Sequence, residues 1–135
     1  MGIFDFLKPS KNLESDNGLN QYYFDKGKGN LKLRFNKKNG KINGLFEIFI
    51  LDGKTAWLIG DFKDGLLHGE LKEWSTSGQC FRMIEKWEMG EKKSWEAFYT
   101  GSSNRGKLDK KGKGGESFLK DDIDRVLKEF SIKNN

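Results

Sequence analysis

Residues 63–80 read KDGLLHGELKEWSTSGQC, and residues 38–55 read KNGKINGLFEIFILDGKT. The glycines at positions 40, 44 and 53 recur at positions 65, 69 and 78, so the two stretches are copies of one unit with a period of 25 residues. Self-similarity at a fixed period indicates a repeat architecture in which every copy has the same fold. The repeat therefore decides how the rest of the chain is interpreted.

Each copy has the pattern of two strands joined by a tight turn. Asp52-Gly53 and Ser77-Gly78 separate strand-like runs, and glycine supplies the positive φ that hairpin turns need. A third partial copy starts near Gly90, and residues 17–35 form a degenerate first copy. We therefore predict a mainly β protein, an antiparallel meander of tandem hairpins. Its roughly seven strands would span 19–24, 31–36, 44–51, 54–62, 69–75, 79–88 and 93–99.

The repeated glycines are predicted to be structural turn glycines, within the hairpins and in the connections between copies. This set comprises Gly40, Gly44, Gly53, Gly65, Gly69, Gly78 and Gly90. Gly44 and Gly69 directly precede a predicted strand, where a missing side chain would let a ring of the neighbouring copy lie across the backbone. Apolar residues along 44–51 alternate onto both faces of the strand, so we expect this hairpin to be covered on both sides.

The repeats span residues 17–99, and the segments on either side of them differ from the repeats in composition. Residues 100–116 are polar, basic and rich in glycine, which predicts a flexible linker. Residues 117–132 carry apolar side chains, including Phe118 and Ile123, at helical spacing behind a candidate N-cap, Ser117. This predicts an amphipathic C-terminal helix that covers one face of the sheet. The apolar segment 1–16 has two open interpretations, a cap on the first hairpin or a weak anchor at a membrane surface.

The stretch FKDGLLHGELKEWSTSGQ, residues 62–79, resembles the variant MORN repeat of many bacterial proteins. The resemblance covers about residues 17–99 and departs from the repeat pattern at Ser94, which stands in place of the second glycine of the third copy. It implies consecutive β-hairpins and a non-enzymatic role. Many such bacterial proteins are described as antitoxins, and MORN repeats in general are associated with scaffolding at membranes or on proteins.

Composition narrows the class of protein. The net charge is +5, but residues 44–91 are acidic overall, whereas 25–43 and 92–115 are basic. A nucleic-acid-binding protein usually gathers its basic residues on one surface, so we predict no specific nucleic-acid partner. The single cysteine, Cys80, excludes an internal disulfide, and we expect a cytoplasmic protein. No apolar run reaches the length of a membrane span.

The residues that could carry chemistry all favour a structural interpretation. His68 is the only histidine, and without a second histidine or more cysteines it cannot form a metal site. Cys80 has no histidine placed to activate it. Residues 111–117, KGKGGES, fail the phosphate-loop pattern. Four glutamates are expected on a solvated strand face rather than in acid–base pairs: Glu70, Glu73, Glu85 and Glu88. We predict no catalytic residue, no metal and no cofactor.

The function predicted from these patterns is binding of a protein partner, in the manner of an antitoxin or immunity protein. The contact residues that we predict are Trp57, Trp74, Trp87, Trp95, Glu70 and Glu73. For each tryptophan, stacking within the repeats remains an alternative to partner contact. The alternative function is that of a scaffold held at anionic lipid by the basic segments 26–41 and 107–113 and by the apolar N-terminus. The sequence leaves the oligomeric state open.

Overall fold

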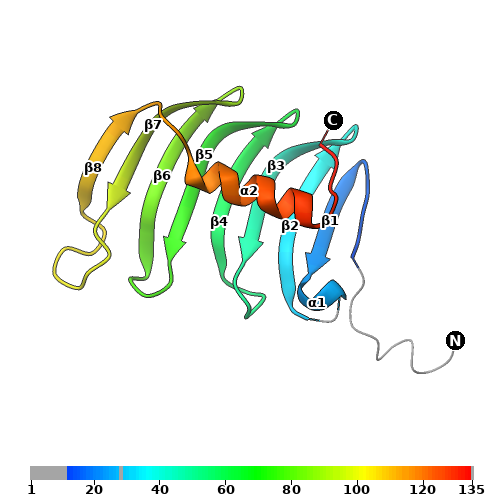
Figure 1. Ribbon diagram of the computed structural model, residues 1–135, viewed down its shortest axis with the longest axis horizontal. Helices are drawn as coiled ribbons and strands as arrows, with labels where there is room; N and C mark the ends of the chain where they lie inside the picture. The colour runs from blue at the N-terminus through cyan, green and yellow to red at the C-terminus, as the bar shows by residue number, and fades with distance from the viewer. Residues whose placement is uncertain (1–11, 28, 135) are drawn as a thin grey trace, which may run out of the picture.

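The computed structural model describes residues 12–27 and 29–134, and this part of the chain forms one eight-stranded sheet and a long C-terminal helix (Figure 1). Strand order follows the sequence, and each strand pairs antiparallel with the next. The elements are β1 (Gly18–Tyr23), α1 (Phe24–Gly27), β2 (Leu31–Lys38), β3 (Lys41–Phe49), β4 (Ala56–Lys63), β5 (Leu66–Ser75), β6 (Cys80–Glu88), β7 (Glu91–Phe98), β8 (Leu108–Lys113) and α2 (Phe118–Glu129). The predicted meander of hairpins with a C-terminal helix is confirmed.

The turns between repeats have the same backbone in every copy. Their central residues are Asn39-Gly40, Asp64-Gly65 and Met89-Gly90, and both residues of each pair have positive φ, between 46° and 86°. Two consecutive residues of this kind define the type I′ hairpin turn, whose twist matches that of the flanking strands. The repeat glycines at these three positions are therefore turn residues, as the sequence predicts.

Each of these turns is held by the repeat before it. The His68 Nδ1 atom accepts a hydrogen bond from the Met89 backbone N–H at 3.1 Å, and the Leu67 carbonyl accepts one from the Gly90 N–H at 2.8 Å. The Asn43 side chain accepts in the same way from the backbone N–H of Asp64 at 3.2 Å. The repeated Asn or His before the second glycine thus satisfies a turn N–H one repeat further on.

Met89 stands where its two counterparts are Asn and Asp, although its φ is 46°. A left-handed backbone is costly for most side chains and much less so for asparagine. We expect Met89→Asn to raise the free energy of unfolding by about 0.5 to 1 kcal/mol. Urea unfolding would measure the change, with Met89→Leu as the control that keeps the strained backbone. Equal stabilities of the two variants would contradict this explanation.

Three glycines behave differently from the prediction. Gly44 and Gly69 lie inside β3 and β5 rather than before a strand, with φ of 91° and 117°. The aromatic ring expected across them is absent: a Cβ added at Gly44 would meet no atom within 4 Å, and one added at Gly69 would meet the side chain of Asp61. Gly78 does not adopt the positive φ of a hairpin turn, which falls on Gln79 instead. A side chain at Gly78 would lie 2.7 Å from the Thr100 carbonyl, so close approach explains this glycine.

Residues 108–113, predicted to belong to a flexible linker, form the eighth strand. β8 pairs with β7 from Ser94 to Phe98, and the connecting loop is closed by a hydrogen bond of 2.9 Å from the Tyr99 N–H to the Lys107 carbonyl. The polar, lysine-rich composition suggested a linker, but lysines are also typical of edge strands. The linker prediction is wrong for this segment because an edge strand needs no apolar face of its own.

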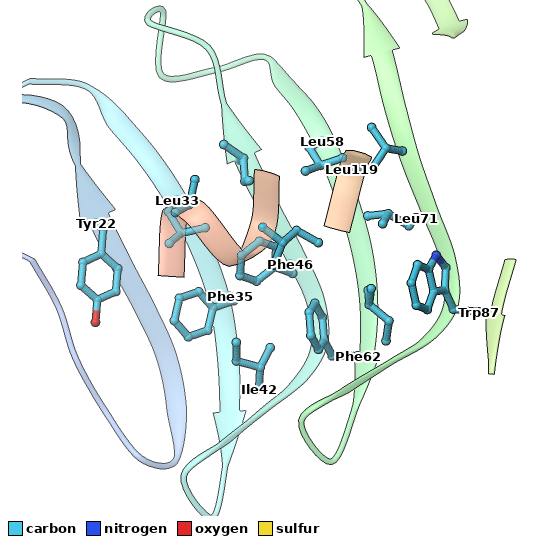
Figure 2. Close-up of a cluster of buried hydrophobic side chains, with 14 residues drawn as sticks. Tyr22, Leu33, Phe35, Ile42, Phe46, Leu58, Phe62, Leu71, Trp87 and Leu119 are labelled. Carbon is cyan, nitrogen blue, oxygen red and sulfur yellow. The ribbon is translucent and has the colours of Figure 1, made fainter. Parts of the chain in front are cut away.

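The core lies between α2 and one face of the sheet, here called the helix face. Its buried residues are Tyr22, Leu33, Phe35, Ile42, Phe46, Ile48, Leu58, Phe62, Leu67, Leu71, Trp87, Leu119, Ile123 and Val126. Figure 2 shows the rings of Phe35, Phe46 and Phe62 side by side across β2, β3 and β4, with centroids 5.5 and 5.3 Å apart. Aromatic pairs at this spacing stabilise the sheet beyond the burial of their area.

The opposite face, here called the open face, carries charged side chains interspersed with apolar ones such as Ile59 and Ile84. A row of paired residues crosses it, with Arg34, Glu47 and Lys72 among them, and the Arg34 guanidinium lies 2.8 Å from the Glu47 carboxylate. Leu45, which points to this face, is 48% exposed. The expectation that the hairpin around residues 44–51 is covered on both sides is therefore wrong at Leu45, whereas Phe49 is 5% exposed beneath the Arg34 guanidinium.

Residues 1–11, including the predicted apolar cap residues Ile3 and Phe4, lie outside the described part of the chain. Residues 12–15, which are described, run along the outer edge of β1.

Candidate functional site

Figure 1 shows that β7 and β8 lie beyond the N-terminal end of α2. The candidate site is a hollow on the helix face at this place. It has a volume of about 490 Å³. We call it the end hollow, and its lining residues are Glu73, Met83, Glu85, Lys92, Trp95, Gly114, Gly115, Glu116, Phe118 and Leu119. α2 begins short of β7 and β8, so it does not cover the helix face of these two strands.

The floor of the end hollow is a buried carboxylate. Glu85 on β6 is 2% exposed. Its Oε1 atom accepts hydrogen bonds from Trp87 Nε1 at 3.1 Å and from Ser117 Oγ at 2.6 Å, while Lys92 Nζ lies 3.1 Å from Oε2. A buried charge is tolerated when it is paired and fully hydrogen-bonded, as this one is. We call Glu85, Trp87, Lys92 and Ser117 the carboxylate network.

The carboxylate network also fixes the start of α2. The Ser117 side chain accepts the Lys120 backbone N–H at 3.0 Å, which makes it the helix N-cap, while its hydroxyl donates to Glu85. Lys92 Nζ donates to the Glu116 carbonyl at 2.7 Å. Both oxygens of Glu85 are engaged by these groups, so the carboxylate holds the start of the helix against the sheet.

The walls of the end hollow are apolar. The Trp95 indole lies over Gly112 of β8, where an added Cβ would come within 2.7 Å of the ring. Met83 and the first residue of α2, Phe118, complete the walls, and Phe118 is 79% exposed. The helical spacing predicted Phe118 to be one of the apolar residues of the helix. It is the first residue of α2, and its ring is exposed to solvent.

The six predicted contact residues do not share one surface. Trp95 and Glu73 line the end hollow, while Trp87 is buried in the core and donates to Glu85 at the floor of the hollow. Glu73 is engaged by Arg82 at 2.7 Å. Trp57 packs against the core further along α2.

The remaining two, Trp74 and Glu70, follow the alternation of β5 onto the open face. Trp74 packs edge-on against Phe81 with centroids 5.0 Å apart, and Lys72 Nζ lies 3.9 Å from the Glu70 carboxylate. These two residues are thus separated by the sheet from Trp87 and Trp95.

Sequence reasoning missed the most informative residue of the site, because Glu85 was expected on a solvated strand face. One signal was available. Glu85 follows Gly60 by one period of 25 residues, and Gly60 pairs with Phe46 and Leu71 in the core row of the helix face. A carboxylate at that position of the repeat indicates a buried partner, which the structure identifies as Lys92.

The side chains that could be reactive, such as His68 and Cys80, contact the backbone of neighbouring turns and loops. His68 holds the Met89 turn, and the Cys80 thiol lies 3.6 Å from the Tyr99 carbonyl. The hydrogen bond from the Tyr99 hydroxyl to Asp109, together with the charge of that carboxylate, raises the pKa of Tyr99. Within residues 12–27 and 29–134, no group of three histidine, cysteine, aspartate or glutamate side chains is arranged to hold a metal ion.

Comparison of the chain with known protein families, with curated proteins and with solved structures found no match. No helix in the described part of the chain is long and apolar enough to cross a membrane.

Proposed function

We propose that this protein is a non-catalytic binding protein that docks a protein partner at the end hollow. The observation that carries the proposal is the exposed Phe118 ring beside Trp95 and Met83, in a hollow on an otherwise covered sheet face. Aromatic anchors in a concave apolar patch are typical of the residues that contribute most to protein–protein affinity.

The base of the hollow supports this proposal because it is rigid before any partner binds. The Trp95 ring rests on the β8 backbone, and the start of α2 is tied to the sheet through Ser117 and Glu85. A preorganised surface spends little of its binding free energy on ordering side chains. The net charge of the Glu85–Lys92 pair is zero, so an apolar side chain of a partner meets no uncompensated charge there.

The kind of partner is proposed from the resemblance to bacterial MORN-variant repeats. On that basis the bound partner is a toxin or effector, and neutralisation is stoichiometric: the protein covers a surface that the partner needs for its activity. A gene adjacent to that of this protein, encoding a product whose toxicity is relieved by co-expression, is the expected genetic signature.

Site-specific photo-crosslinking tests the proposal directly. A benzophenone amino acid at position 118 in the native host is expected to capture one predominant protein, identified by mass spectrometry, because this ring would lie in the interface. The same amino acid at position 45 is the matched control, since Leu45 is also exposed but lies on the open face. Identical adducts from both positions, or no adduct from position 118, would refute the proposed docking site.

A second candidate function is attachment to anionic lipid, which the exposed lysines of β8 favour. Lys110, Lys111 and Lys113 are all exposed along this edge strand. Clustered lysines near a membrane surface attract anionic headgroups by about 1 kcal/mol each.

A further inference from the structure

The two edges of the sheet, at β1 and at β8, differ in whether other residues of the chain cover them. The outer edge of β1 is occupied: Leu13 and Gln21 exchange both backbone hydrogen bonds, at 2.8 and 2.9 Å, and the Asn12 side chain accepts the Tyr23 N–H at 3.1 Å. These contacts satisfy backbone groups that would otherwise be open to pairing with another strand. The chain therefore blocks one of its two edges with its own residues.

The edge at β8 has no such cover among the described residues, since β7 is its only strand neighbour. Its ladder shows which backbone groups point outward. Gly114 donates to the Lys93 carbonyl at 3.1 Å, and in an antiparallel pair hydrogen-bonded and non-hydrogen-bonded positions alternate. The N–H and C=O groups of Lys111 and Lys113 therefore face away from β7, in the orientation that a ninth strand requires.

The positive charge of the β8 edge determines which kind of strand can pair with it. Lys107, Lys110, Lys111 and Lys113 are exposed, and Asp109 is the one acidic residue of β8. A second copy of the chain would set lysine against lysine, which is unfavourable for directly opposed residues. An acidic strand would meet complementary charge at Lys111 and Lys113.

The free edge also adjoins the end hollow. Gly112 pairs with Trp95 and has no side chain, so the indole is reachable across β8 from the position of a ninth strand. A residue opposite Gly112 on the helix face would contact the ring, while its two neighbours would face Lys111 and Lys113 on the open face. The β8 edge and the end hollow together favour a strand in which acidic and apolar residues alternate.

We infer that β8 is a strand-addition site: an extended acidic segment of the partner pairs with it as a ninth antiparallel strand and places an apolar side chain against Trp95. This inference rests on the proposed function and specifies the chemistry of the partner. Backbone hydrogen bonds to Lys111 and Lys113 would supply affinity, and the hollow and the lysines would supply specificity.

The test uses the full chain and a synthetic peptide, acetyl-EVEFEVE-amide, with acetyl-KVKFKVK-amide as its counterpart. Calorimetry is expected to show that the acidic peptide binds at least about tenfold more tightly. Lys113→Pro removes one outward N–H at an edge where proline is tolerated, and is expected to weaken binding by about tenfold. The matched control Lys113→Gln loses the charge but keeps the N–H, and is expected to weaken binding by about twofold.

A second measurement keeps the test decisive if the proline variant is perturbed. In the unmodified protein, the acidic peptide is expected to slow amide hydrogen exchange at Lys111 and Lys113. Unchanged exchange there, or equal effects of the Pro and Gln substitutions, would overturn strand addition and leave only electrostatic attraction. Absence of peptide binding would overturn it too, with the lysines then serving to keep edges apart.

Vesicles of phosphatidylcholine with phosphatidylserine separate the lipid alternative. Vesicle binding that is lost in Lys113→Gln, without any peptide binding, would replace this inference by membrane attachment. If a protein is captured from position 118 and its affinity is unaffected by Lys113→Pro, the proposed function stands and strand addition at β8 is refuted.

Discussion

Replacing Phe46 with alanine is expected to lower the free energy of unfolding by about 3 to 5 kcal/mol. Phe46 is fully buried on β3, near the middle of the sheet, with the rings of Phe35 and Phe62 on either side. Its partner on β4 is Gly60, which has no side chain that could move into the space. The cavity would therefore remain open, which places the cost in the upper part of the range for such substitutions.

Urea unfolding followed by circular dichroism measures this cost. Leu45→Ala is the matched control because Leu45 is the adjacent residue on the same strand but points to the open face. Its expected cost is within about 1 kcal/mol, as for most exposed positions. If the two variants lost similar stability, the helix face would not be the core, and the assignment of the two faces would be wrong.

The hairpins could be predicted from the sequence because their signals are local. A pair such as Asn39-Gly40 favours a type I′ turn whatever its surroundings, and the turn then sets the pairing of the flanking strands. The helix was also predictable, since Ser117 and the spacing of Leu119, Ile123 and Val126 are contained in one segment.

The features that were missed depend on distant residues. Gly78 is required by Thr100, and Gly112 by the Trp95 ring, so neither requirement is visible in the neighbouring sequence. β8 carries almost no strand pattern of its own, because its pairing with β7 and not its composition defines it. The end hollow is a consequence of where α2 begins relative to β7, a relation that no local pattern contains.

The predicted contact residues lie on both faces of the sheet. Trp74 and Glu73 are both among the predicted contact residues, but adjacent residues on a strand point to opposite faces. Glu73 consequently lines the end hollow, while Trp74 packs on Phe81 behind the sheet. Partner contact by Trp74 would need a second interface on the open face.

Glu85→Ala is expected to lower the free energy of unfolding by about 3 to 5 kcal/mol, the usual cost of removing one member of a buried ion pair. The substitution leaves the Lys92 ammonium buried without its carboxylate, and the Trp87 N–H and Ser117 hydroxyl lose their acceptor. Glu70→Ala is the control, because Glu70 is exposed and its contact with Lys72 is 3.9 Å long.

A double-mutant cycle with Lys92→Met separates the ion pair from the rest of the carboxylate network. If the charge left on Lys92 causes most of the loss, Glu85→Ala combined with Lys92→Met is expected to recover about 1 to 3 kcal/mol relative to Glu85→Ala alone. Strict additivity of the two substitutions would contradict a direct Glu85–Lys92 interaction. Because Ser117 caps α2 and bonds to Glu85, the single variant should also increase amide exchange in the first turn of the helix more than in its last turn. A uniform increase along α2 would mean that Glu85 stabilises the sheet and does not hold the helix start, and the position of Phe118 in the end hollow would then lack its structural support.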